Sequence, residues 1–183
     1  MTKHNFKIIL FLAATLAFIF LSQSVFSQAD WFKVGSAPKQ YENFIDSSNQ
    51  HNGKSIVTLK SVDANINGFG ALMQNMKPEK YLGKRVRMTG YFKSKDVTGW
   101  AGFWFRVDQS GSEHSLSFDN MNDRPIKGTT DWKKYEIVLD VPDNASNIAF
   151  GALINGTGQI WIDNVNFEMV NNTIPTTGQK IQE

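Results

Sequence analysis

The chain of 183 residues has no cysteine, only three histidines and no apolar run as long as a membrane span. Without cysteine, the protein has neither disulfide bonds nor a lipid-anchored cysteine. The longest apolar run, from Ile8 to Leu21, has about 14 residues, whereas a membrane-spanning helix needs roughly 20. The fold must therefore be held together by packing, with or without the help of a bound ion.

The N-terminus has the pattern of a secretory signal peptide. Lys3 and Lys7 precede the apolar run, and the small-residue exit Val25-Phe26-Ser27 follows it. We expect three parts: a signal peptide at 1–27, one domain at 28–170 and a disordered tail at 171–183. The protein is then secreted or periplasmic, by a bacterial export route, and has no membrane association after cleavage.

The charge balance excludes two classes of partner. The expected mature chain has 17 basic and 17 acidic residues, because the removed segment carries two lysines and no acid. Nucleic acids and anionic lipids are bound mainly when excess basic residues neutralise their phosphates. We therefore expect no nucleic-acid partner and no anionic membrane partner.

Short runs of β-branched and aromatic residues alternate with turn residues along the whole expected domain. This pattern predicts an all-β protein, an antiparallel β-sandwich of jelly-roll type with about ten short strands. Only the segment 77–82 favours a helical turn. The predicted strands are 31–34, 41–45, 55–62, 70–76, 84–93, 100–108, 115–119, 133–141, 147–154 and 159–168.

The alternation of apolar side chains predicts which strand faces are buried. Each half-buried strand presents its apolar set to a core between two sheets. The expected core positions of the three clearest strands are Val86, Met88, Phe92, Phe103, Phe105, Val107, Tyr135, Ile137, Leu139 and Val141.

The last strand, GQIWIDNVNF (158–167), changes the phase of its apolar pattern in the middle. Its four apolar positions on the two sides of the change are Ile160, Ile162, Val165 and Phe167. A β-bulge at Asp163-Asn164 would turn all four inward and leave Trp161 outside. A continuous strand would instead bury Asp163, which would then need an ion or several hydrogen-bond donors. We favour the bulge, because it does not bury the charge of Asp163.

Residues suited to catalysis are sparse. His51 adjoins an Asn-Gly turn and His114 lies in a polar hairpin, so both are expected at the surface. No nucleophile elbow, zinc-binding helix or phosphate loop occurs. Glycoside hydrolysis needs two carboxylates directed at one bond, but the acids are scattered singly at strand ends and turns. We expect no enzymatic activity and keep a hydrolase with scattered carboxylates as an alternative.

A binding surface is predicted from the polar faces of two successive strands. Arg87 and Tyr91 on the first strand, and Trp104 and Arg106 on the second, alternate with core residues. If these strands pair, the four residues form one patch, in which aromatic faces stack on sugar rings and arginines donate hydrogen bonds. The alternative is that Trp104 packs under a loop and is covered by the stems of the arginines.

Three motifs stand in order along the chain: HNGKSIVTLKS (51–61), TDWKKYEIVLDVPDNA (130–145) and GTGQIWIDNVNF (156–167). They resemble motifs of the jelly-roll carbohydrate-binding modules and the wider galactose-binding-like domains, and the likeness covers about residues 31–169. The resemblance implies fold more firmly than ligand. In many such modules the aspartate of the closing strand binds a structural calcium, and the matching residue is Asp163. The opening DWFKV, however, lacks the usual glutamate companion.

We therefore expect a secreted, non-catalytic binding module for a carbohydrate or a related polar ligand. The expected ligand-binding residues are Arg87, Tyr91, Trp104 and Arg106. No cofactor is required, and Asp163 is the candidate ligand of the structural calcium that the resemblance implies. The alternative is a protein-interaction or structural accessory domain of the cell envelope, in which the aromatic patch meets a protein partner.

Overall fold

The computed structural model describes residues 31–52 and 54–178, and the expected signal peptide lies outside them. No helix in this part of the chain is long and apolar enough to cross a membrane. Two short 3-10 turns occur, η2 (Pro38–Gln40) and η3 (Glu79–Tyr81), the second within the predicted helical segment. The strands are β1 (Phe32–Gly35), β2 (Tyr41–His51), β3 (Lys54–Ser61), β4 (Phe69–Met76), β5 (Lys84–Asp108), β6 (Ser115–Asp119), β7 (Ile126–Val141), β8 (Asn147–Asn155) and β9 (Gln159–Val170).

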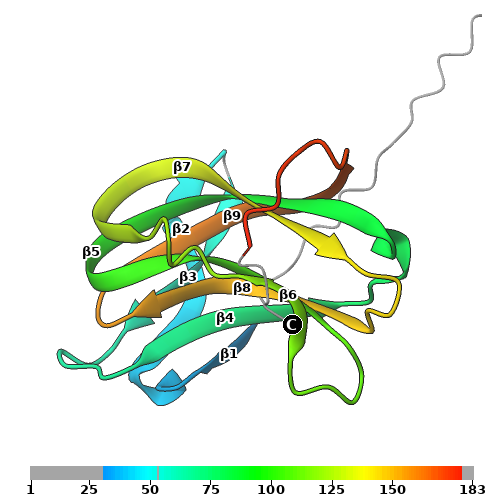
Figure 1. The fold of residues 1–183 in the computed structure, drawn as a ribbon. Helices are drawn as coiled ribbons and strands as arrows, with labels where there is room; N and C mark the ends of the chain where they lie inside the picture. Colours follow the sequence, from blue (N-terminus) through cyan, green and yellow to red (C-terminus); the bar gives the residue numbers. More distant parts are fainter. Residues whose placement is uncertain (1–30, 53, 179–183) are drawn as a thin grey trace, which may run out of the picture.

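Two antiparallel layers pack face to face, and β5 belongs to both. One layer has the order β2-β3-β9-β5-β7 and the other β1-β4-β8-β5-β6. The first half of β5 pairs with β9 and β7, and its second half pairs with β8 and β6. Figure 1 shows β8, β4 and β1 side by side on one side of β5, with β9 on the other. The architecture is the predicted all-β jelly-roll sandwich.

The predicted strands 84–93 and 100–108 are one continuous strand, the 25-residue β5. Its pairing with β7 shifts register between Ser94 and Ala101, and Asp96 has a positive φ of 52°. These irregularities bend the strand from one layer into the other without reversing it. The structure therefore has nine strands in its described part, where the sequence predicted about ten.

The core lies between the layers and follows the predicted alternation. Of the ten expected core positions, nine are buried, and Tyr135 is partly buried against them. The rings of Phe92 and Phe103, from the two halves of β5, meet edge to face with centroids 5.1 Å apart. The two halves of β5 thus face each other across the core, and their outward side chains lie on opposite surfaces.

The phase change in β9 is a β-bulge, as predicted. Opposite Gly90 the register between β5 and β9 slips by one residue, and Asn164 has a φ of 52°. All four apolar residues of the stretch then join or pack against the core. Trp161 points outward as expected, but it is only 4% exposed: Lys93 extends over its ring, and its Nε1 donates a 2.8 Å hydrogen bond to the carboxylate of Asp46.

Residues 171–178 differ from the prediction of a disordered tail. Thr177 exchanges backbone and side-chain hydrogen bonds with Val138 of β7, and Arg85 donates to the carbonyl oxygens of Asn172 and Ile174. In Figure 1 this segment, in red, turns back across the molecule after β9. These hydrogen bonds attach the segment to β7 and to the start of β5. Residues 179–183 lie outside the described residues.

Candidate ligand-binding groove

The structure does not bring the four predicted binding residues together. Arg87 and Tyr91 project from the first half of β5, whereas Trp104 and Arg106 project from the second half, on the opposite outer surface. The predicted patch required pairing between two strands, but the two segments are parts of one strand. Each pair therefore belongs to a different surface of the sandwich.

Arg87 and Tyr91 take part in contacts within the protein. Arg87 forms ion pairs with Glu136 at 3.5 Å and Glu168 at 3.2 Å on the flanking strands. The ring of Tyr91 packs on the ring of His51, with centroids 4.6 Å apart. Arg87 and Tyr91 therefore contact other residues of the protein and are not free to bind a ligand.

Small residues hollow the outer face of the other layer. Gly151 of β8 and Gly102 of β5 point outward and are covered by Trp104 and Met121 respectively, whereas Ala71 of β4 points outward and lines the hollow itself. A Cβ atom on Gly151 would stand 1.8 Å from the carbonyl oxygen of Leu72. Only glycine therefore fits there, and the indole of Trp104 packs over it. Ala71 and Gly35, which are also small, leave a depression in the sheet surface.

Large side chains surround the depression and turn it into a groove of about 350 Å³. Trp104, 7% exposed, lies against Gly151, and Trp100 stands at one end beside Asn155. The indole Nε1 of Trp104 is buried and has no hydrogen-bond partner among the described residues. The lining residues are Val34, Gly35, Phe69, Ala71, Met73, Trp100, Trp104, Arg106, Phe118, Asn120, Leu153 and Asn155.

Few polar groups reach the groove. Arg106 is paired through Nε with Asp108 at 2.8 Å, yet 45% of its side chain is exposed. Asn120, after β6, and Asn155, at the end of β8, supply amide groups. No carboxylate and no imidazole is among the lining residues. The groove can therefore stack and hydrogen-bond a ligand, but its own lining has no acid–base pair.

Asp163 contacts a histidine and does not form part of a metal-binding site. Its Oδ2 lies 2.7 Å from Nδ1 of His51, whose ring stacks between Tyr91 and Trp132 with both centroids 4.6 Å away. Calcium requires six to eight oxygen ligands. No group of three or more metal-ligating side chains occurs in the part of the chain that the structure describes. The residues around Asp163 therefore do not fit a calcium ion.

Calcium and EDTA are expected to leave the unfolding temperature of the protein unchanged to within about 1 °C, because a ligand stabilises only a state that binds it. Differential scanning calorimetry of residues 28–183 with each additive measures this. Asp163→Asn should show the same lack of response. A rise in unfolding temperature with calcium that Asp163→Asn abolishes would contradict the assignment.

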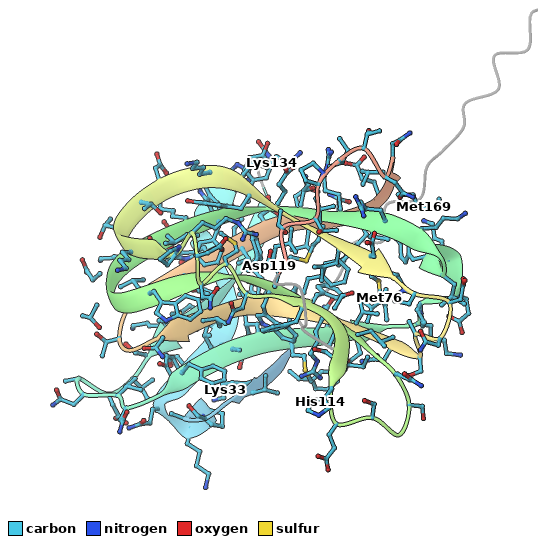
Figure 2. The ribbon with its side chains drawn as sticks, viewed as in Figure 1. Lys33, Met76, His114, Asp119, Lys134 and Met169 are labelled. Atoms are coloured by element: carbon cyan, nitrogen blue, oxygen red, sulfur yellow. The ribbon has the colours of Figure 1, made fainter. Side chains whose placement is uncertain are left out.

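Asp119 is another acidic residue that is engaged in structural contacts. Asp119, 5% exposed, accepts hydrogen bonds from the Arg124 guanidinium at 2.7 Å, from the backbone N–H of Met121 and from Thr177. Burial tends to lower the pKa of Arg124, but its bonds to Asp119 and Asp123 outweigh this and raise it. In Figure 2 Asp119 lies in the middle of the view, among packed side chains, whereas His114 lies near the edge. This cluster joins the loop after β6 to the C-terminal segment.

A second hollow, of about 380 Å³, lies on the opposite outer surface, and it is polar. Asp46 is at its base, only 9% exposed, and accepts hydrogen bonds from Ser48, Asn49 and Trp161. Lys93 extends over the ring of Trp161, 5.7 Å from its centroid. The carboxylate of Asp46 and the indole of Trp161 thus bind each other, and the second carboxylate of the hollow, Asp96, accepts a hydrogen bond from Thr129 at 3.2 Å.

The fold is that of the jelly-roll carbohydrate-binding modules. The CBM22-1 xylan-binding domain of Paenibacillus barcinonensis Xyn10C superposes with a TM-score of 0.56 at 15% identity, over 79% of this chain and 88% of that one. The enzymatically active domain of bacteriophage CBA120 tailspike protein 4 gives a TM-score of 0.53 at 15% identity, over 78% of this chain but only 20% of that one. At such identities the likeness establishes the fold alone.

In sequence, the chain is similar to a longer bacterial protein. It is 47% identical over 148 residues to the uncharacterized HTH-type transcriptional regulator YbfP of Bacillus subtilis (strain 168). The match covers 80% of this chain and 50% of the regulator, so the chain spans about half the length of this relative. No family model matches the chain.

Proposed function

We propose that the protein is a non-catalytic binding module that takes a carbohydrate or a related polar ligand in the groove over β1, β4, β8, β5 and β6. The observation that carries the proposal is the hollowed sheet face, with Trp100 and Trp104 beside the depression and amide and guanidinium groups at its margin. Aromatic rings pack on the C–H faces of sugars, and Arg106 and the asparagines donate hydrogen bonds to oxygen atoms. Largely preformed grooves with few polar groups are common ligand sites.

The comparisons support a binding role. A solved module of the same fold is named as xylan-binding, and the likeness to half of a transcriptional regulator fits a ligand-sensing part joined to a separate DNA-binding part in that relative. The groove lining also lacks the two carboxylates that glycoside hydrolysis requires.

The five tryptophans allow a direct test by NMR. When xylo-, cello- and galacto-oligosaccharides are titrated into the ¹⁵N-labelled chain, the indole N–H signals of Trp100 and Trp104 should shift. The indole signals of Trp31, Trp132 and Trp161, outside the groove, should not.

Trp104→Ala is expected to weaken the affinity for the bound glycan at least about tenfold, as removal of a central aromatic side chain commonly does. Trp132→Ala, on the opposite surface, is the matched control and should keep wild-type affinity. Titration calorimetry measures both affinities, and a melting curve checks that each variant is folded. Glycan-induced shifts confined to Trp132 or Trp161 would place the site elsewhere, and binding by none of the glycans would oppose the proposal.

A further inference from the structure

Building on the proposed function, we infer that the ligand is amphiphilic, with a sugar or similar polar part joined to an alkyl or aryl part. The polar part lies over β5 and β6, and the apolar part lies over β4 and β1. One side of the groove has polar side chains and the other has only apolar ones. A glycan with hydroxyl groups along its whole length does not match this difference.

The side formed by β5 and β6 can bind polar groups. The exposed guanidinium of Arg106 stands beside Phe118, its cross-strand neighbour, and Asn120 follows on the chain after β6. Trp104 lies next to them and provides an aromatic surface. Because Arg106 is the only charged residue that lines the groove, this side suits a neutral or acidic sugar.

The side formed by β1 and β4 has no polar side chain at all among the lining residues. Val34, Phe69, Ala71 and Met73 form it, and the outward neighbour of Met73 on the edge strand is Phe32, which is 58% exposed. Sugar hydroxyls placed here would lose water and gain no hydrogen bond in exchange. An alkyl or aryl group would instead remove apolar surface from water on both partners.

The ratio of two affinities tests this inference independently of the identity of the sugar. The probes are the methyl and n-octyl β-glycosides of glucose and of xylose, with the octyl compounds kept below their micelle-forming concentration. Each buried methylene should strengthen binding about fourfold. The octyl glycoside is therefore expected to bind at least tenfold more tightly than the methyl glycoside in titration calorimetry.

Two nearly isosteric substitutions address the apolar side. Val34→Thr combined with Met73→Gln should reduce the octyl-to-methyl ratio to within about threefold, because it weakens binding of the octyl glycoside far more than binding of the methyl glycoside. Met169→Gln is the control, because Met169 is also exposed but lies on β9, far from Lys33 of β1 in Figure 2. This variant should keep the wild-type ratio.

Each result bears on one of the two claims. Three results would overturn the inference that the ligand is amphiphilic. The first is equal affinity for the methyl and octyl glycosides. The others are an octyl preference that survives in the Val34→Thr, Met73→Gln variant, and binding of 1-octanol as tight as that of the octyl glycoside. The first of these results would leave the proposed function intact. Failure of every glycoside to shift the indole signal of Trp104 would count against the proposed function itself.

Discussion

Gly151→Ala is expected to lower the free energy of unfolding by about 3 kcal/mol or more, the upper range for overpacked sites. The added Cβ would stand 1.8 Å from the carbonyl oxygen of Leu72. That oxygen belongs to the backbone of β4, which pairs with β8 along their whole length and cannot move alone. Urea denaturation monitored by circular dichroism measures the loss.

Gly111→Ala is the matched control for this substitution. Gly111 has a φ of +74°, but a Cβ there would meet nothing within 4 Å. Its replacement should cost only the strain of a left-handed conformation, about 1–2 kcal/mol. A loss for Gly151→Ala no larger than that for Gly111→Ala would contradict the steric reason.

The same substitution bears on the groove. The Cβ would also approach Nε1 of Trp104 to 3.1 Å, so the indole beside the depression would have to shift by a few tenths of an ångström. A folded fraction of Gly151→Ala should therefore bind the glycan more weakly than the wild type. Gly151 thus links the stability of the layer to the shape of the candidate site.

Asp46→Ala is expected to destabilise the protein by about 3 kcal/mol, because it leaves the buried indole N–H of Trp161 without an acceptor and removes two bonds to the following backbone. The carboxylate accepts from Nε1 of Trp161 at 2.8 Å and from the backbone N–H groups of Ser48 at 2.9 Å and Asn49 at 3.2 Å. Asp46→Asn keeps one oxygen and the shape of the side chain, and should cost clearly less. Equal melting temperatures for Asp46→Ala and the wild type would refute this role.

The same carboxylate predicts acid sensitivity. Burial alone would raise the pKa of Asp46, but hydrogen bonds from Ser48, Trp161 and Asn49 outweigh it and hold the pKa well below its usual value. A lowered pKa in the folded state stabilises the protein fully above the unfolded-state pKa, near 4. This contribution is lost as the pH falls below that value. Unfolding free energies measured from pH 6 down to about pH 2 should therefore fall less for Asp46→Asn than for the wild type.

Local patterns predicted the fold well where a strand has one wet face and one buried face. Alternation placed Val86, Met88 and Phe103 in the core, and the phase change in β9 predicted its bulge. The continuity of β5 escaped prediction, because Thr98-Gly99 has the composition of a turn. In the structure Gly99 instead lies against the backbone of Asn155, a contact between residues distant in sequence.

The candidate site was predicted only in part, because it depends on which surfaces face the same way. Trp104 and Arg106 line one groove, and that placement follows from their alternation along the strand. Arg87 and Tyr91 also alternate with core residues, but they lie on the opposite surface from Trp104 and Arg106, since β5 crosses between layers. The outward Ala71 and Gly151 were the overlooked signal, because Ala71 leaves room in the groove and Gly151 lets the indole of Trp104 lie against the sheet.

The strand order has a consequence for how the chain reaches its native state. β1 and β4 join the remaining structure through β8, and β2 and β3 join it through β9, although β8 and β9 come last in the chain. During synthesis the first four strands therefore emerge long before their partners, with unpaired edges and apolar faces exposed to water. Such distant pairings slow folding and expose intermediates to aggregation. A nascent chain that stops before β9 would leave the β2–β3 hairpin without a sheet to join.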